Sequence, residues 1–330
     1  MAAVARLQRA ERRCAMKRIM RFWTLLALLA MTACEHKELC YEHPHVGFVH
    51  VLFDWSQLPG ANPECMYVRF FPEEGGRPVQ YEFTGRDGGT VQLSPGNYRI
   101  ICHNGDMEST HARNTEQYDT FEFYTPQESL LAPLNRSSSN VPRADGTETQ
   151  QVVRTPEYLY GDCCGELTLR RNETTTVTLT PTERVCTYTV EIRNVENMDK
   201  VVQISGTLSG MAGAYCLVAD ALRDAPCILP FEFRKADATT VEAHFHTFGH
   251  CPEPAVPHKI VVYGIMTRGA QQYQVYGDAE DVVTPQIHGA ADPHRVHIVL
   301  DGLRFTDDAP GGGMNPSVDD WGSVEIEIPM

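Results

Sequence analysis

The chain has 330 residues, with 28 Lys and Arg against 43 Asp and Glu, which gives a net charge of -15. Residues 1–33 hold seven basic residues and one Glu, so the chain from Cys34 onward has a net charge of about -21. Nucleic-acid binding depends on neutralising phosphates with Lys and Arg, so this balance argues against a nucleic-acid partner. It also argues against direct contact between the folded part and anionic lipid headgroups.

The N-terminal residues have the order of a secretory signal: a basic segment, an apolar run, and small residues before a cysteine. The basic segment is 16–21 (MKRIMR), the apolar run is 22–31, and Cys34 follows Thr-Ala. A membrane span needs about 20 apolar residues, and this run is too short. The pattern predicts a bacterial lipoprotein signal peptide over 1–33, removed before Cys34, whose thiol carries the lipid.

The first fifteen residues have no apolar run, so we expect Met16 to be the true start of the protein. Residues 34–44 would form a lipidated tether, and several acyl chains on Cys34 would hold it stably at the outer membrane. The acidic Glu35 and Glu38 resemble the export signal of surface lipoproteins in the Bacteroidales. They favour display at the cell surface over a periplasmic-facing location.

The remaining sequence has strand patterns and lacks long amphipathic helices. Segments such as 66–70 (MYVRF) and 79–83 (VQYEF) alternate apolar and polar residues, which is typical of sheets with one buried face. Each half has about seven such segments, at spacings that suit a Greek-key sandwich. We therefore predict an all-β protein with two tandem β-sandwich domains, at 45–181 and 182–305. The best helical candidate is 210–223, and its two glycines weaken it.

Two segments lack the alternation of apolar and polar residues over most of their length. Residues 126–155 are rich in Ser, Pro and polar residues, and we expect them to form an exposed or flexible loop within the first domain. The tail 306–330 is rich in Gly and Asp, and it ends in an alternating run that contains Val324, Ile326 and Ile328. This run predicts a final β-strand.

Nine cysteines remain after Cys14 and Cys34, so at least one has no disulfide partner within the chain. Cys186 alternates with apolar residues of a predicted strand, and we expect it to be a small buried hydrophobic residue. Cys216 and Cys227 are close enough in the sequence to form a disulfide. No C-x-x-C pair is present, so a redox or zinc-ribbon motif has no support.

The sequence carries no H-E-x-x-H, G-x-S-x-G, Walker A or dinucleotide-binding motif, and we expect neither catalysis nor a cofactor. The best metal-binding candidates are His244 and His246 on a predicted strand, with His250, Cys251 and His258 after it. Imidazole and thiolate groups suit zinc or copper. In the simpler interpretation the polar side chains face solvent while the apolar residues between them pack inward, so we expect no metal site.

Several segments occur together in a pattern that resembles a known family. They are 93–104 (LSPGNYRIICHN), 206–215 (GTLSGMAGAY), 230–233 (PFEF), 246–249 (HTFG), 295–303 (RVHIVLDGL) and 318–321 (VDDW). With the lipidated cysteine, they resemble an uncharacterised family of Bacteroidales lipoproteins related to fimbrial anchor and accessory subunits. The resemblance covers nearly the whole chain after the signal peptide.

The resemblance implies two transthyretin-like β-sandwiches in tandem on a lipid anchor, and no catalytic residues. It implies a non-enzymatic cell-surface protein that anchors, caps or accompanies a fimbria-like adhesive assembly of β-sandwich subunits. In such assemblies one subunit's strand completes another subunit's sheet. Val324, Ile326 and Ile328 have the pattern of a donor strand. They would otherwise pair within their own second domain and close an edge that is prone to aggregation.

A different function, binding of a surface glycan or nutrient, remains the alternative. It would require exposed aromatic side chains on one face of the protein, on which a sugar ring could stack. Only two tryptophans, Trp55 and Trp321, follow the signal peptide.

Overall fold

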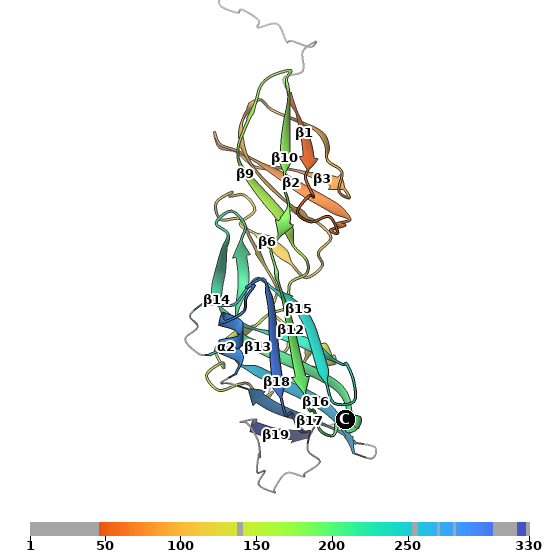
Figure 1. The fold of residues 1–330 in the computed structure, drawn as a ribbon. Coiled ribbons are helices and arrows are strands. Elements are labelled where there is room, and N and C mark those ends of the chain that lie inside the picture. Colours follow the sequence, from red (N-terminus) through yellow and green to blue (C-terminus); the bar gives the residue numbers. More distant parts are fainter. Residues whose placement is uncertain are drawn as a thin grey trace, which may run out of the picture. The chain divides into compact units, whose positions relative to one another are not determined.

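The computed structural model describes residues 46–136, 141–252, 257–268, 271–279, 282–305 and 322–327 (Figure 1). All of these residues belong to one compact unit that begins at His45. The predicted signal peptide and the predicted lipid site Cys34 lie outside the described residues. Among the described residues, no helix is both long and apolar enough to cross a membrane.

The first core lies between two sheets. The smaller sheet has the order β10 (Thr174–Leu179), β1 (Gly47–Phe53), β4 (Gly89–Leu93). The larger has the order β11 (Thr182–Glu183), β9 (Tyr160–Leu169), β5 (Gly96–Asn104), β2 (Cys65–Pro72), β3 (Val79–Thr84). Apolar side chains from both sheets form one cluster, which is the packing of a β-sandwich.

The alternation predicted for 66–70 is confirmed. Met66, Val68 and Phe70 of β2 are fully buried, whereas Tyr67 and Arg69 between them are partly exposed. Successive side chains of a strand point to opposite faces, so one face of β2 covers the core.

The second core belongs to a sheet whose main path has eight strands. Their order is β18 (Arg295–Asp301), β12 (Cys186–Arg193), β15 (Val241–Thr247), β14 (Ala221–Lys235), β13 (Val201–Cys216), β16 (Ile260–Arg268), β17 (Gln271–Ala279), β19 (Gly322–Glu327). Three short strands lie off this path: β6 (His111–Arg113), β7 (Glu122–Tyr124) and β8 (Gln151–Val152). Two 3-10 turns, η1 (Ala132–Leu134) and η2 (Met198–Lys200), and the helix α2 (Val283–His288) complete the described elements.

Strands β14 and β15 pair only where Arg234 and Lys235 meet the start of β15. The sheet can therefore fold over at this joint, so that β18, β12 and β15 face β14, β13 and β16. Apolar side chains from both groups form a single cluster, in which Phe231 of β14 stacks on Phe245 of β15 with ring centroids 4.2 Å apart. The prediction of an all-β protein with packed sheets is confirmed.

The chain leaves the first sandwich at β11, which pairs with β9, and enters the second sheet at Cys186 of β12. The domain limits at residues 181 and 182 stay a prediction, because both cores belong to the same compact unit. Cys186 is 7% exposed and lies in the second core, as expected for a small buried hydrophobic residue.

The described residues of the segment 126–155, which are 126–136 and 141–155, pack against the second sheet. β8 runs parallel to β14 and pairs with it at Cys227 and Ile228. A small core here consists of Leu131, Leu134, Ala144, Val261, Tyr263 and Ile265. The prediction of an exposed loop within the first domain is wrong for this segment. Its apolar residues recur without a period, so no pattern in the sequence indicated that they are buried.

The weak helix prediction at 210–223 is wrong, because these residues form the end of β13 and the start of β14. Cys216 lies opposite Ala221, whereas Cys227 lies opposite Met211. At about 3.3 Å per residue, the two cysteines are about 16 Å apart along the hairpin. A disulfide requires Cα atoms within about 7 Å of each other, so the suggested pairing is wrong.

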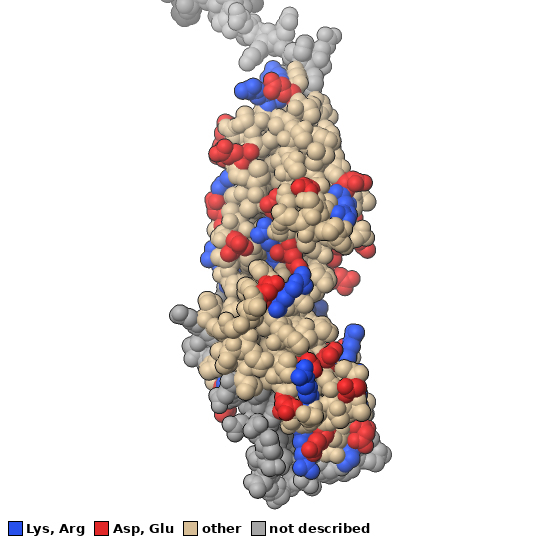
Figure 2. Space-filling model, in the orientation of Figure 1, with Lys and Arg blue, Asp and Glu red and all other residues tan. Residues whose placement is uncertain are grey.

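Charged side chains are dispersed over one face of the molecule. On the face shown in Figure 2, acidic and basic side chains are interspersed over the described part of the chain. On this face the negative charge is therefore spread out. Such a surface repels other copies of the chain and offers no basic patch that would bind a polyanion.

An aromatic cluster connects β5, β7 and β13. Phe121 and Phe123 are fully buried in it, together with Tyr215 and Ile101. His103 of β5 packs against these rings, with its centroid 5.0 Å from that of Phe123 and 5.8 Å from that of Phe121. Burial, aided by the Arg69 charge and opposed by a hydrogen bond to the Asn104 carbonyl, lowers the pKa of His103 to about 4.

We expect Gly88→Ala to destabilise the first sandwich. A Cβ atom at Gly88 would lie 1.8 Å from the carbonyl oxygen of Val51 in β1, so the backbone of one strand must move. Overpacking of this kind typically reduces the free energy of unfolding by about 1–3 kcal/mol, measured by urea denaturation. Gly165→Ala in β9 is the matched control, because a Cβ there meets no atom within 4 Å. Equal stabilities of the two variants would contradict this prediction.

We expect His103 to make stability depend on pH. An unfolded histidine has a pKa of about 6.5 and gains a proton below it, whereas folded His103 stays neutral until about pH 4. The free energy of unfolding should therefore fall between about pH 6.5 and 4, by about 3 kcal/mol in total from this residue. NMR titration of the His103 ring, with urea denaturation at several pH values, measures both quantities. A His103 midpoint near 6.5 would refute the prediction.

Candidate functional site: strand edges and histidines

The C-terminal strand pairs with its own chain. β19 runs antiparallel to β17, with Val324 opposite Tyr276 and Ile326 opposite Gln274. This is the intramolecular arrangement given above as the alternative to strand exchange. Ile328 lies outside the described residues. The role of Val324, Ile326 and Ile328 as a donor strand stays a prediction.

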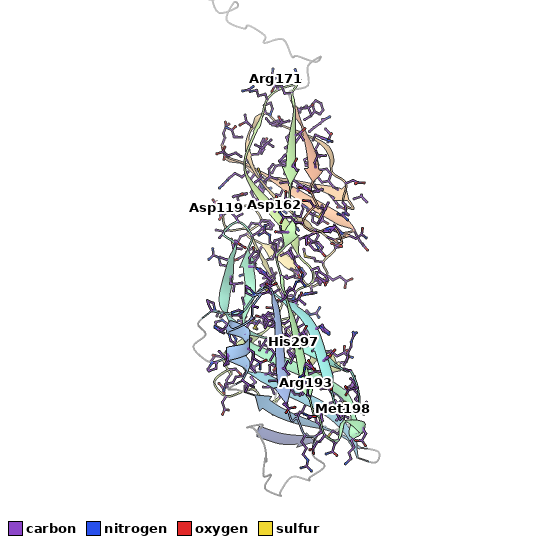
Figure 3. All side chains as sticks on the ribbon, in the orientation of Figure 1. Asp119, Asp162, Arg171, Arg193, Met198 and His297 are labelled. Atoms are coloured by element: carbon purple, nitrogen blue, oxygen red, sulfur yellow. The ribbon has the colours of Figure 1, made fainter. Side chains whose placement is uncertain are left out.

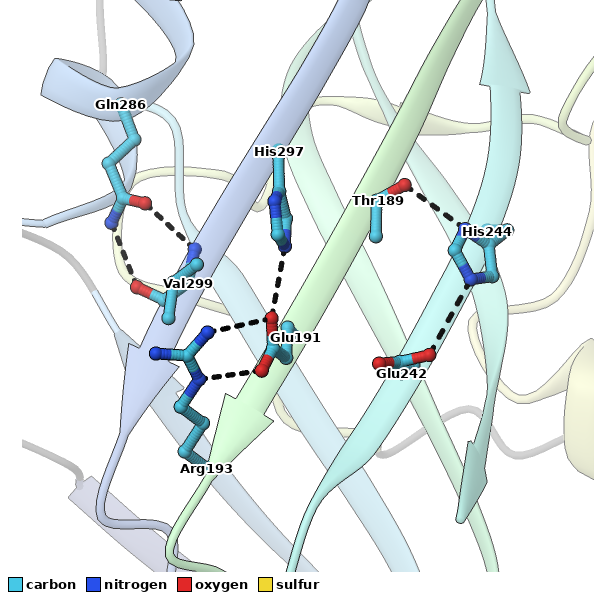
Figure 4. A network of polar contacts seen from close by, with 8 residues as sticks. All are labelled: Thr189, Glu191, Arg193, Glu242, His244, Gln286, His297 and Val299. Atoms are coloured by element: carbon cyan, nitrogen blue, oxygen red, sulfur yellow. Dashed lines mark hydrogen bonds and ion pairs between the residues drawn. The ribbon is translucent and has the colours of Figure 1, made fainter. Parts of the chain in front are cut away.

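The other end of the same sheet is the edge of β18, and the side chain of Gln286 in α2 covers part of it. The Gln286 amide donates to the Val299 carbonyl at 3.0 Å, and the Val299 N–H donates to Oε1 of Gln286 at 2.7 Å (Figure 4). These two bonds replace those that a neighbouring strand would make. Val283 and Ile287 are buried in the second core and hold α2 in place.

The exposed face of β18, β12 and β15 carries a polar network (Figures 3 and 4). Glu191 of β12 accepts two hydrogen bonds from Arg193, at 2.6 and 3.1 Å, and contacts His297 of β18 at 3.1 Å. The hydrogen bonds from Arg193 are the main reason why the pKa of Glu191 is lowered. Surface ion pairs of this kind contribute little stability, so the network defines a polar face more than it holds the fold.

The alternation predicted for the strand at 241–247 is confirmed, because its apolar residues Val241, Ala243 and Phe245 are buried. His244 lies on the exposed face, 3.0 Å from the Thr189 hydroxyl and 3.7 Å from a Glu242 carboxylate oxygen.

His246 has a different neighbour, the ring of Tyr158, at a centroid distance of 4.1 Å. Tyr158 is 50% exposed, whereas Trp55 is only 7% exposed and donates its indole N–H to the Arg86 carbonyl. Trp55 therefore offers no open aromatic surface for a sugar, and Trp321 lies outside the described residues.

The predicted metal candidates separate into different environments. His250 and Cys251 follow β15, and a backbone bridge pairs His250 with Met211 of β13. Burial raises the pKa of the Cys251 thiol. In the described part of the chain, no group of three or more His, Cys, Asp or Glu side chains is placed so that it could hold a metal ion.

A different set of histidines does come together. His250, His258 and His288 have ring centroids 5.0–5.7 Å apart, and the Nε2 atoms of His258 and His288 are 3.1 Å apart. Burial, with the neighbouring His258 and His288, lowers the pKa of His250 to about 4, and burial also lowers that of His258. His288 lies 30 residues beyond His258 at the end of α2, so no spacing in the sequence indicated that it belongs to the group.

Comparison with known proteins gives a relative of nearly equal length. The chain is 26% identical over 340 aligned residues to a Bacteroides ovatus protein named "Putative fimbrium anchoring subunit Fim4B". The alignment covers 93% of this chain and 96% of that protein.

A solved structure has a similar fold. The crystal structure of a "putative adhesin" from Bacteroides ovatus superposes with a TM-score of 0.58 at 22% sequence identity, covering 84% of this chain and 99% of that one. This similarity supports the β-rich fold described above. The family model described as "Domain of unknown function (DUF5119)" matches residues 33–232, which is more than half of the sequence. The chain therefore belongs to the DUF5119 family.

Proposed function

We propose that this chain is a non-enzymatic lipoprotein of the outer membrane that faces the cell surface and anchors, caps or accompanies a fimbria-like adhesive assembly. The observation that carries the proposal is the similarity to the fimbrium anchoring subunit, which extends over 93% of this chain and 96% of the relative. Similarity restricted to one part of the two proteins, such as one sandwich, would be weaker support for a shared role. Lipid on Cys34 would supply the membrane attachment.

The fold supplies a means of assembly. Its sheets expose strand edges, and pairing at such an edge gives affinity through main-chain hydrogen bonds and specificity through alternate side chains. Among the described elements, β19 is the last strand of its sheet and the last strand in sequence order. We propose that Val324, Ile326 and Ile328 pair with a fimbrial-type β-sandwich subunit, in place of β17.

We expect the triple substitution of Val324, Ile326 and Ile328 by Ser to abolish co-purification of a β-sandwich partner. The native lipidated protein would be captured from intact cells, and its partners identified by mass spectrometry. Alternation along a strand puts Glu325 and Glu327 on the opposite face, so Glu325→Gln with Glu327→Gln is the matched control and should retain the partner.

A stoichiometric partner that survives the triple substitution would refute the role of this strand, while the assembly role would stand. Capture of no protein partner by the native chain would refute the assembly role itself. Glycan binding would then be the function to test.

We expect Cys34→Ser to release the protein from the membrane fraction. The cysteine thiol is the site of lipid attachment in the lipoprotein signal, and a serine hydroxyl, a much weaker nucleophile than a thiolate, would not take its place. Cell fractionation and protease treatment of intact cells measure attachment and surface exposure. Cys40→Ser, six residues later, is the control and should leave the protein attached. Membrane attachment of the Cys34→Ser protein would contradict the anchor.

A further inference from the structure

We infer that a cleft beside β13 is a binding site for a neutral carbohydrate of one or two sugar rings. The cleft lies where the register of β13 with β14 shifts between Ala212 and Ala214, and its volume is about 470 Å³. Small-molecule sites in proteins usually have volumes of about 300–1,000 Å³. Carbohydrate binding here would be a function separate from the strand pairing proposed for β19.

Main-chain pairing forms a closed circuit around the cleft. β13 pairs with β7 on one side and with β14 on the other, and β8 pairs with β14. A backbone bridge between Gln127 and Val153 connects the end of β8 to the residues that follow β7. The cleft is therefore formed before a ligand arrives, which lowers the entropy cost of binding.

The charge of the lining favours an uncharged ligand. Among the described residues that line the cleft, Arg113 is the only charged one. Its Nε donates to a Glu122 carboxylate oxygen at 2.6 Å, and its guanidinium lies over the Tyr124 ring, 5.1 Å from the centroid. The Glu122 carboxylate offsets the Arg113 charge, so the cleft attracts an anion only weakly. These lining residues include no Asp or Glu that would attract a cation.

The neutral polar side chains of the lining suit sugar hydroxyls. Gln127 and Gln151 present carboxamides, and Thr125 and Thr149 present hydroxyls. None of these four side chains is hydrogen-bonded to another residue in the described part of the chain. Carboxamides and hydroxyls both donate and accept hydrogen bonds, which is what the hydroxyls of a sugar require of their partners. Gln127, Thr149 and Gln151 are exposed, so a sugar can enter from solvent.

The rest of the lining is mostly small and apolar. Val153 and Cys227 are buried, and Gly213 and Pro226 also line the cleft. Such residues can contact the C–H face of a sugar ring, and Tyr124 adds a partly exposed aromatic ring. An extended peptide is a poorer match, because it would bind along an open strand edge or place its side chains in apolar pockets.

The test uses the full chain and a panel of neutral sugars: the methyl glycosides of glucose, galactose, mannose and N-acetylglucosamine, with maltose and lactose. Saturation-transfer NMR detects binding, and calorimetry measures the dissociation constant. We expect one site per chain for at least one of these sugars. Because the ligand is uncharged, its affinity should be the same at about 0.05 and 0.5 M NaCl.

Gln127→Ala combined with Gln151→Ala should weaken sugar binding at least about 5-fold, because two hydrogen bonds are lost. Both side chains are exposed, so the fold should be retained, which circular dichroism checks. Ala225→Phe should abolish binding, because Ala225 is an exposed residue of the lining and a phenyl ring there would fill the cleft. Gln92→Ala, an exposed position of β4 in the first sandwich, is the matched control and should bind normally.

Sugar binding that either the double substitution or Ala225→Phe leaves unchanged would overturn the site. Failure of the native chain to bind any sugar of the panel would overturn it as well. Loss of binding in the Gln92→Ala control would place the sugar elsewhere, and an affinity that falls with salt would overturn the assignment to a neutral ligand. None of these outcomes bears on the pairing of β19, so the two proposals fail separately.

Discussion

The backbone pairing of β13 is the interaction on which the rest of the second half depends. Along one side this strand pairs with β14, and along the other it pairs first with β16 and then with β7. Its register with β14 shifts after Leu208 and again after Ala212, so the strand bends between its two partners. Such shifts bend the strand and change the direction in which its side chains point. They let a single strand serve both the second core and the aromatic cluster around Phe123.

The bend in β13 also explains where the histidines meet. Gly210 lies within the first of these shifts, between Leu208 and Met211, with a φ of +76°, a conformation that glycine adopts readily. Its N–H donates to the Gln150 side-chain oxygen at 3.0 Å, and its carbonyl accepts a hydrogen bond from the Cys251 N–H. The missing side chain leaves room for His258. The irregular backbone and the histidine group are therefore parts of one arrangement.

The alternation of apolar and polar residues was the most informative signal in the sequence. In a strand with one buried face, the apolar positions are the buried ones, so the sequence itself indicates which residues form the core. This is why β2 and β15 were predicted correctly, and why Cys186 was recognised as a core residue. The same signal fails at the end of β13, which the helix prediction at 210–223 overlaps, because thirteen consecutive residues from Ile204 to Cys216 are buried and no exposed face remains. A strand that is buried on both faces has a continuous run of small and apolar residues. A buried short helix can have the same kind of run, so periodicity does not distinguish the two.

The packing of 126–155 and the meeting of His288 with His258 could not be predicted for a different reason. Both depend on contacts between segments that are far apart in the chain, and neither leaves a local pattern. Sequence spacing groups residues on one element, such as His244 with His246, and these two have different partners in the structure. The proposed strand role of the C-terminal residues rests on the alternating pattern and on the pairing of β19 with β17. The predicted lipid site Cys34 rests on the signal sequence alone.

The amide of Gln286 on the edge of β18 has a consequence for how many neighbours this sheet can accept. With Val299 bonded to a side chain of its own molecule, the β18 end offers an interrupted row of backbone groups to an incoming strand. If the chain pairs with a fimbrial subunit as proposed, the β19 end is the one left for that pairing, and the described part of this sheet would have a valence of one. A subunit with a valence of one terminates a series of paired subunits, whereas a subunit with two open edges extends it.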